Sequence, residues 1–314
     1  MTFILKSAIL VLFTCTVVRS QGTTGQLEDI FKGRCLNYKI TRANTLTDIP
    51  TVDCNELWTN FSRSWTFKDS CSQNVTSYAN VFNFLNQTLP KDKALLWSGT
   101  NDFAHAFSNN GKRYITLEDT LIGFIANGLD WCGQTSAPGI NYRSCPAYFS
   151  CPGEVKSSYW LEASKWFASN AEGDIHVALN GSMSGNRLAY RRDSIFASVE
   201  VPTLRSGRVK KLTAILVHDL GRPITESCGS QSLLDLKSDL HAKNIAFDCV
   251  ENPPEVKYLL CYDTPNSPEC DQCDPSGRST GGAAGLIKTG GGIHNHLVAL
   301  ITFVTSITVK LIIN

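Results

Sequence analysis

Residues 195–202 read Ile-Phe-Ala-Ser-Val-Glu-Val-Pro. Apolar and β-branched residues recur there at period two, which is typical of a short strand, and Pro202 would end its hydrogen-bonded ladder. A strand in this place leaves Glu200 near the carboxyl end of a sheet, where open α/β sheets present residues to a ligand crevice. Glu200 is therefore the first candidate for a functional carboxylate. The alternative is a strand-end glutamate that points into water, which is the usual position of this residue type.

Four more short apolar runs predict strands, and they are 94–99, 174–179, 212–218 and 245–249. A helical pattern over Leu233–Ala242 separates the last two. Strands that alternate with helices indicate a small, largely parallel sheet, because parallel neighbours need a crossover connection. The sequence therefore predicts a fold of the α+β or α/β class.

The first part of the chain has mostly helical patterns. They run, with interruptions, from Leu27 to about Pro90, then over Thr116–Asn127 and Tyr159–Phe167. Glu118 and Asp119 fall in the first turn of the second pattern, so stabilising a helix start is the alternative to any chemical role for them. Helices followed by a sheet predict two lobes, with the active site in the cleft between them.

Both ends of the chain have the pattern of processing signals. Lys6 precedes an apolar run, so we expect 1–20 to be the signal peptide of a secreted protein. Small residues and a polar spacer over 276–296, then an apolar tail over 297–314, are typical of a segment replaced by a glycolipid (GPI) anchor. The alternative is a membrane span, but the apolar run ends at Lys310 and is shorter than the roughly 20 residues that a span needs. We expect a protein anchored by lipid to the outer leaflet, on the extracellular face of the plasma membrane.

Charge and cysteine content narrow the class further. A net charge of +1 without a Lys/Arg stripe argues against a nucleic-acid partner. Of the 12 cysteines, Cys15 would leave with the signal peptide, and the other 11 would form disulfides in an oxidising compartment with one thiol left over. Cys270-Asp-Gln-Cys273 is an alternative metal or redox motif, although a structural disulfide suits a secreted chain better. Four candidate glycosylation sites, any one of which is alternatively unused, are Asn60, Asn74, Asn86 and Asn180.

Several catalytic motifs are absent from the sequence. It contains no H-E-x-x-H, no G-x-S-x-G and no G-x-G-x-x-G after a strand. The glycine-rich stretch 281–289 lacks the spacing of a P-loop. We therefore expect no zincin, serine hydrolase or Rossmann dehydrogenase, and neither a metal site nor a cofactor.

Tryptophans and carboxylates remain as candidates, and they are Trp97, Trp160, Glu118 and Glu200. Tryptophan faces attract a planar cationic ring, and an ionised carboxylate stabilises the cationic sugar that such a ring leaves behind. A pyridinium departs as a neutral base, so one carboxylate is enough. The more common role of such tryptophans is core packing. A glycosidase for neutral sugars is a weaker alternative, because it needs a second acid.

Six motifs resemble one known family. They are Leu95-Leu-Trp-Ser, Thr116-Leu-Glu-Asp-Thr-Leu, Trp131-Cys-Gly, Asn141-Tyr-Arg-Ser-Cys-Pro, His176-Val-Ala-Leu-Asn-Gly-Ser and Phe196-Ala-Ser-Val-Glu. Together they resemble the ADP-ribosyl cyclase family, which includes lymphocyte-surface NAD glycohydrolases, mollusc cyclases and glycolipid-anchored schistosome surface members. The resemblance covers Cys35 to Cys270. It implies a helical lobe from 21–90 and 116–171 and an α/β lobe from 91–115 and 172–275.

The resemblance also implies roles for the candidates. Glu200 would be the catalytic carboxylate, Trp97 and Trp160 would flank the nicotinamide, Glu118 would contact the nicotinamide and bias the fate of the intermediate, and Ser164 would bind the ribose-phosphate. The implied disulfides, which leave Cys273 spare, are Cys35–Cys54, Cys71–Cys151, Cys132–Cys145, Cys228–Cys249 and Cys261–Cys270.

Three positions depart from the family's pattern. Asn127 stands where relatives have an acid on the nicotinamide side, and Gly99 stands where some have a basic residue. Ile195 replaces a hydroxyl residue that contacts ligand, at the end of a stretch that is longer than in mammalian members. The first departure puts the substrate-binding role of Asn127 in doubt, the second a phosphate contact at Gly99, and the third the shape of the cleft near Ile195. None of them changes Glu200.

These observations predict an ecto-enzyme that hydrolyses NAD+, its substrate rather than its cofactor, to ADP-ribose and nicotinamide. Cyclisation and base exchange would be minor outcomes of the same intermediate. The alternative is a cell-surface binding or receptor module that has kept the fold and lost turnover, since disulfides, glycans and an anchor suit it equally well. The sequence does not predict an oligomeric state.

Overall fold

The structure is a computed structural model that describes residues 22–42, 52–85, 88–136, 139–185 and 187–272, all within one compact unit. Several expectations lie outside the described residues: the signal peptide 1–20, Asn86, Cys273, the anchor region 276–296 and the tail 297–314. Within the described ranges, every helix is too short or too polar to serve as a membrane span.

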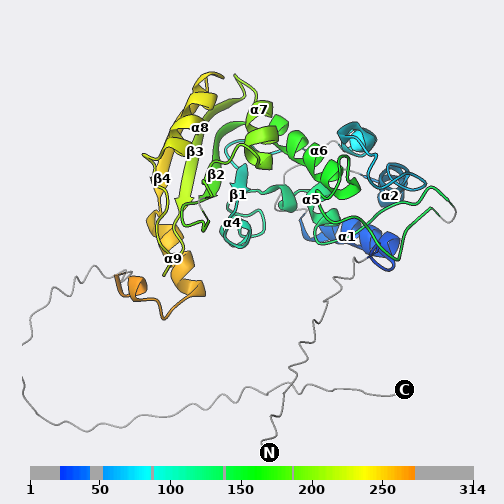
Figure 1. Cartoon of the computed structure of the whole chain (residues 1–314), viewed down its shortest axis with the longest axis horizontal. Helices are drawn as coiled ribbons and strands as arrows, with labels where there is room; N and C mark the ends of the chain where they lie inside the picture. The colour runs from blue at the N-terminus through cyan, green and yellow to red at the C-terminus, as the bar shows by residue number, and fades with distance from the viewer. Residues whose placement is uncertain (1–21, 43–51, 86–87, 137–138, 186, 273–314) are drawn as a thin grey trace, which may run out of the picture. The chain divides into compact units, whose positions relative to one another are not determined.

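Four parallel strands form one sheet in the order β1-β2-β3-β4 (Figure 1). The strands are β1 (Leu95–Ser98), β2 (Gly173–Asn180), β3 (Val209–Val217) and β4 (Ala246–Glu251). The prediction of a small parallel sheet is confirmed, and four of the five predicted strands belong to it. Trp97 is in register with Ala178 of the neighbouring strand, so the last residues of β1 and β2 lie at the same edge of the sheet.

Both faces of the sheet are buried, which explains why its strands are nearly continuous apolar runs. One face packs through Leu96, Val177 and Leu216 into the main core of the protein. The other face packs through Leu95 and Ala178, among others, into a smaller core with α4 (Asn101–Ser108) and α9 (Pro254–Asp263). Alternate residues of one strand therefore contribute to different cores.

Helices dominate the first part of the chain, as predicted. They are α1 (Leu27–Thr41), α2 (Cys54–Arg63), α3 (Ala79–Phe84), α5 (Leu121–Ala126) and α6 (Val155–Asn170), with the 3₁₀ turns η1 (Val75–Tyr78) and η2 (Leu117–Asp119). Their core is aromatic: the Phe61 ring lies 4.7 Å from Phe31 and 5.1 Å from Trp131, centroid to centroid. Within this core, Trp131 Nε1 donates to the Tyr78 hydroxyl at 2.9 Å, so the buried indole N–H of Trp131 is paired. The division into two lobes remains a prediction.

The prediction of a strand over 195–202 is wrong. Residues Phe196–Glu200 form a π-helical turn, η3, which continues into α7 (Val201–Thr203) and includes Pro202 in a helical first turn. The buried positions are 196, 197, 200, 201 and 204, a spacing of about four that belongs to a helix. Ser194 starts this helix, since its Oγ accepts the Ala197 N–H at 3.1 Å. An eight-residue run is short enough to satisfy both periods, and packing selects the helix.

The helix predicted from Thr116 is also different in detail. Thr116 begins the short turn η2, and the chain starts again at Thr120, whose Oγ1 accepts the Gly123 N–H and so caps α5. A Cβ atom at Gly123 would lie 2.0 Å from the Leu117 carbonyl oxygen, so only glycine permits this close return.

The remaining helices follow the sheet strands. They are α8 (Gln231–His241), which lies beside β4 in Figure 1, α9 and the short turn η4 (Pro268–Gln272). The helix predicted over Leu233–Ala242 is confirmed as α8. All five disulfides implied by the family resemblance are present: Cys35–Cys54, Cys71–Cys151, Cys132–Cys145, Cys228–Cys249 and Cys261–Cys270. Cys270 is therefore bonded to Cys261, which argues against a metal or redox motif with Cys273.

Candidate active site

A cavity of about 520 Å³ lies where the carboxyl end of β1 meets η2, α6 and η3. The six residues proposed as the site line it together: Trp97, Glu118, Asn127, Trp160, Ser164 and Glu200. They come from five separate segments of the chain, so the fold alone brings them together. Their chemical roles remain predictions.

Glu200 is the most unusual group in the cavity. It ends the η3 turn, its side chain is buried with 7% of the residue exposed, and its Oε2 atom has no hydrogen-bond partner among the described residues. Burial raises the pKa of this carboxyl to about 8; the nearby Ser164 hydroxyl opposes the shift, and the Glu118 charge adds to it. Such a carboxylate has lost its water and gained little in return, so a cation brought into the cavity would be strongly attracted to it.

Glu118 and Asp119 have different fates although they are adjacent. Asp119 is buried, and it accepts bonds from the Thr116 N–H and hydroxyl at 3.0 Å each, which stabilises the start of η2. Glu118 lines the cavity instead, and its Oε2 accepts the Trp97 indole N–H at 3.3 Å. The alternative of a helix-start role therefore describes Asp119 but not Glu118. The bond to Glu118 also orients the Trp97 ring.

Helix α6 provides Trp160 and Ser164, one turn apart, and Phe167 three residues further on. Residues at this spacing share one helix face, as the sequence pattern predicts. Trp160 packs edge-on against the buried Tyr159 ring, with centroids 5.5 Å apart. This contact holds the indole of Trp160, which also lines the cavity. Core packing alone does not describe Trp160, because the residue is only partly buried.

Asn127 lies at the exposed edge of the cavity, directly after α5. Its carbonyl oxygen accepts the Arg34 Nη1 hydrogen at 2.6 Å, so its backbone is tied to α1. An amide at this position adds no charge to the site. Of the carboxylates that line the cavity, the Asp193 side chain is 81% exposed, so Glu118 and Glu200 are the two that lie away from bulk water.

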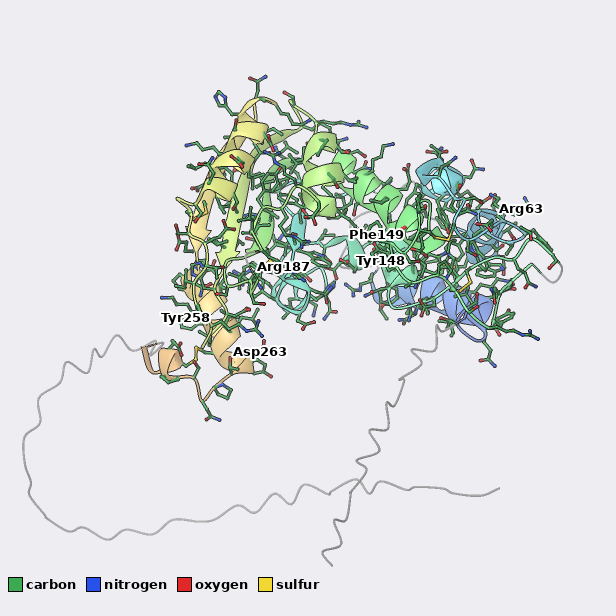
Figure 2. The ribbon with its side chains drawn as sticks, viewed as in Figure 1. Arg63, Tyr148, Phe149, Arg187, Tyr258 and Asp263 are labelled. Carbon is green, nitrogen blue, oxygen red and sulfur yellow. A yellow bond between two sulfur atoms is a disulfide. The ribbon has the colours of Figure 1, made fainter. Side chains whose placement is uncertain are left out.

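Sequence reasoning missed several residues of the cavity lining, of which Tyr148, Phe149 and Arg191 have the side chains best suited to bind a ligand. Tyr148 and Phe149 are exposed neighbours whose rings lie 4.4 Å apart, and both are labelled in Figure 2. An aromatic pair in a loop between Cys145 and Cys151 was the available signal. Arg191 carried no such signal, because nothing in its own neighbourhood distinguishes it from a surface arginine.

The structure shows where three of the predicted glycosylation sites lie, but it does not test whether they carry glycans. Asn74 is exposed, and Asn60 is partly buried. Asn180 ends β2, and its Nδ2 atom, the point of glycan attachment, donates to the Gly99 carbonyl oxygen at 3.1 Å. A glycan on Asn180 would replace one of the two Nδ2 hydrogens and leave a single N–H for that bond. In the described ranges, no group of three or more His, Cys, Asp or Glu side chains is arranged to hold a metal ion.

The sequence of this chain is similar to those of known proteins. The family model described as ADP-ribosyl cyclase matches residues 24–270. The chain belongs to the ADP-ribosyl cyclase family. It is 46% identical over 247 residues to an ADP-ribosyl cyclase/cyclic ADP-ribose hydrolase of Aplysia kurodai, which covers 79% of this chain and 87% of that protein. It is 36% identical over 255 residues to ADP-ribosyl cyclase/cyclic ADP-ribose hydrolase 1 of Rattus norvegicus, with 81% and 82% covered.

Solved structures of ADP-ribosyl cyclases share the fold. Aplysia cyclase complexed with substrate NGD and product cGDPR superposes with a TM-score of 0.76 at 44% identity, over 79% of this chain and 98% of that chain. Porcine CD38 complexed with a covalent intermediate superposes with a TM-score of 0.68 at 36% identity, over 74% and 98%. The family resemblance inferred from six motifs is confirmed, and the protein is an enzyme of the ADP-ribosyl cyclase family.

Proposed function

We propose that this cyclase-family enzyme acts chiefly as an NAD+ glycohydrolase, which converts NAD+ and water to ADP-ribose, nicotinamide and a proton. The observation that carries the proposal is Glu200: a buried carboxylate with an unpartnered oxygen, in a cavity that also presents the indoles of Trp97 and Trp160. A cationic pyridinium ring suits both features, because indole faces and a desolvated carboxylate each attract positive charge.

The bond that breaks joins the ribose C1′ to the nicotinamide nitrogen. Its electron pair leaves with the nitrogen, so nicotinamide departs neutral and needs no acid. Positive charge then develops on the ribose, where ionised Glu200 stabilises it or forms an ester with C1′. Trp97, oriented by its bond to Glu118, and Trp160 would hold the departing ring. Attack by water on the same face completes hydrolysis with retention and releases the proton.

Partition of the ribosyl intermediate decides the product. Water leads to ADP-ribose, the folded-back adenine leads to cyclic ADP-ribose, and another base leads to exchange. Several residues of the cavity lining, among them Asn127, Gly128 and Phe149, are exposed, so the cavity is open to solvent. Because water reaches the sugar easily through such an opening, we expect hydrolysis to dominate, with cyclisation and base exchange as minor reactions.

Separation of the products from purified secreted protein and NAD+ tests this proposal. We expect nicotinamide in equal amount to the sum of ribosyl products, and ADP-ribose in excess over cyclic ADP-ribose. Cyclic product in excess would contradict the hydrolase assignment while leaving the NAD+ chemistry intact. Absence of nicotinamide release would instead support a non-catalytic binding module.

Substitution Glu200→Gln tests the carboxylate itself. The amide keeps the shape and removes the charge, so we expect nicotinamide release to fall by at least about 10³-fold, because electrostatic stabilisation of the ribosyl cation is lost. Asp119→Asn is a matched control, since Asp119 belongs to η2 and does not line the cavity. Undiminished release from the Glu200→Gln protein would exclude Glu200 as the catalytic group.

We also propose that the enzyme acts outside the cell, held by a glycolipid anchor. Five disulfides within the described residues support an oxidising compartment. Treatment of intact cells with a phosphatidylinositol-specific phospholipase should release NAD+-cleaving activity into the medium. Activity that stays with the cells, while a known anchored control protein is released, would contradict the anchor.

A further inference from the structure

The cavity presents an electrostatic problem for a dinucleotide. Glu118 and Glu200 favour the cationic nicotinamide end of NAD+, but its pyrophosphate carries two negative charges that the same carboxylates repel. A site that accepts the whole molecule therefore needs a cation at some distance from Glu200. Gly99, which follows Trp97 in the lining, has no side chain to provide one.

Arg191 is the one Lys or Arg side chain among the described residues that line the cavity. Its nearest charged partner is Asp193, whose Oδ1 lies 3.7 Å from Nε. The Asp193 side chain is 81% exposed, so water screens this pair and it contributes little. Within the described part of the chain, the two terminal nitrogens of Arg191 have no hydrogen-bond acceptor, and a planar guanidinium can present both to a phosphate.

The backbone at Arg191 holds it in a fixed relation to Glu200. Its carbonyl oxygen accepts two bonds from Ser194, from the N–H at 3.1 Å and from the hydroxyl at 2.7 Å. The same Ser194 hydroxyl oxygen accepts the Ala197 N–H and so begins the helical segment that ends at Glu200. One short, continuous piece of chain thus carries a cation at its start and the catalytic carboxylate at its end.

The neighbouring Arg192 shows a different arrangement. Its guanidinium forms an ion pair with Asp239 and lies over the Tyr190 ring, 5.1 Å from the centroid. It does not line the cavity. Two consecutive arginines therefore have separate surroundings, and Arg192 provides a matched control.

We propose that Arg191 binds the pyrophosphate of the substrate and makes the enzyme selective for dinucleotides over nicotinamide ribosides. This inference rests on the proposed NAD+ glycohydrolase function and adds a specificity-determining residue to it. Glu200 and the tryptophans recognise the end that reacts, and Arg191 recognises the part that does not react but distinguishes NAD+ from smaller pyridinium nucleosides.

The test compares ligands with and without the pyrophosphate in four proteins: wild type, Arg191→Gln, Arg191→Lys and Arg192→Gln. We expect Arg191→Gln to raise KM for NAD+ and the inhibition constant of ADP-ribose by about 10- to 100-fold, the usual effect of losing a charge-assisted bond, with kcat within about 3-fold. Its kcat/KM for nicotinamide riboside should equal that of wild type. Arg191→Lys should keep part of the affinity for both ligands. Arg192→Gln should change neither KM for NAD+ nor the inhibition constant of ADP-ribose.

Different failures of this experiment have different meanings. An equal loss for NAD+ and nicotinamide riboside would show that Arg191 shapes the cavity or positions Glu200, and would overturn the proposal. Unchanged KM and inhibition constants in Arg191→Gln would overturn it as well. A wild-type protein that releases no nicotinamide would refute the proposed function instead, and calorimetric affinities for ADP-ribose in wild type and Arg191→Gln would then decide the role of Arg191 independently.

Discussion

Glu200 combines an ionisable group with nearly complete burial, and catalysis and stability make opposite demands on it. Stabilising a ribosyl cation requires the ionised form, whereas burial favours the neutral acid and raises the pKa to about 8. The free enzyme therefore carries its carboxyl mostly protonated near neutral pH. In the proposed reaction, a bound pyridinium would supply the missing positive charge and favour ionisation of Glu200, so substrate binding itself would prepare the carboxylate.

This situation predicts a displaced pH profile. The value of kcat/KM for NAD+, which reports the free enzyme, should fall about tenfold per pH unit below about pH 8. The acidic limb of kcat should lie at lower pH, because the pyridinium cation lowers the pKa of Glu200 in the complex. Ser164→Ala should move the kcat/KM limb upward, since the Ser164 hydroxyl holds the pKa down. Initial rates from pH 4 to pH 10 check this, and a limb near 4.5 in kcat/KM would contradict it.

The same burial predicts that Glu200→Gln stabilises the fold. A group whose folded pKa of about 8 exceeds its ordinary 4.5 binds its proton more tightly when folded, so stability is highest below pH 4.5 and declines as pH rises toward 8. Glutamine has no proton to lose. Urea unfolding should show the variant more stable than wild type at pH 8, by on the order of 2–4 kcal/mol, and nearly equal to it at pH 5. Equal stability at both pH values would contradict the desolvation of Glu200.

Among the elements, the segment η3–α7 is the one on which the site depends most. Its wide π turn places Glu200 and Val201 on the buried side together with Phe196 and Ala197. Insertions of this kind in helices often lie at functional sites, because they redirect a side chain that a regular helix would place elsewhere. Helix α6 packs against this segment and carries Trp160 and Ser164, so the two elements form one wall of the cavity.

Helix α6 begins at a buried N-cap, which makes a second stability prediction possible. Glu154 is fully buried, and its carboxylate accepts the Lys156 and Ser157 N–H groups at 3.0 and 2.8 Å. Glu154→Ala should lower the free energy of unfolding by about 2 kcal/mol, through the lost cap, the buried Ser157 N–H and the partly buried Lys156 N–H left unpaired. Asp53→Ala, at the exposed cap of α2, is the matched control and should lower it by about 1 kcal/mol or less. Urea unfolding of both variants decides this, and a larger loss for Asp53→Ala would contradict it.

For the molecule as a whole, the disulfides join parts of the chain that lie far apart in sequence. Cys71–Cys151 spans 80 residues and ties the region before η1 to the loop that carries Tyr148 and Phe149 at the cavity edge. Cys261–Cys270 spans only 9 residues at the end of the described chain. The longer loop restricts the unfolded chain more, so the two bonds contribute unequally to stability.

We expect replacement of Cys71 and Cys151 by serine to lower the free energy of unfolding about 2 kcal/mol more than the same change at Cys261 and Cys270, from the difference in loop length. The measurement is urea unfolding of both double variants under oxidising conditions. Nicotinamide release at low temperature serves as a check that each variant folds. A larger loss from the Cys261 and Cys270 pair would contradict the prediction.

The parallel sheet, the helical first part of the chain and helix α6 could be inferred from residue patterns, because the period of apolar residues is set by which face each element buries. Six motifs were enough to recognise the family and, through it, the five cysteine pairs and the candidate site. The conformation of 195–202 was not predictable, since a run of this length fits two periods and only its packing against α6 separates them.

Other properties belong to the folded chain alone. The high pKa of Glu200 arises from water excluded by residues far away in sequence, and the separate surroundings of Glu118 and Asp119 arise within the turn η2, where Asp119 bonds back to Thr116 while Glu118 reaches Trp97. Arg191 has a cavity beside it while Arg192 has Asp239. Neighbours along the chain shared the same local pattern in each case, and burial, which is a property of the whole packed structure, made them different.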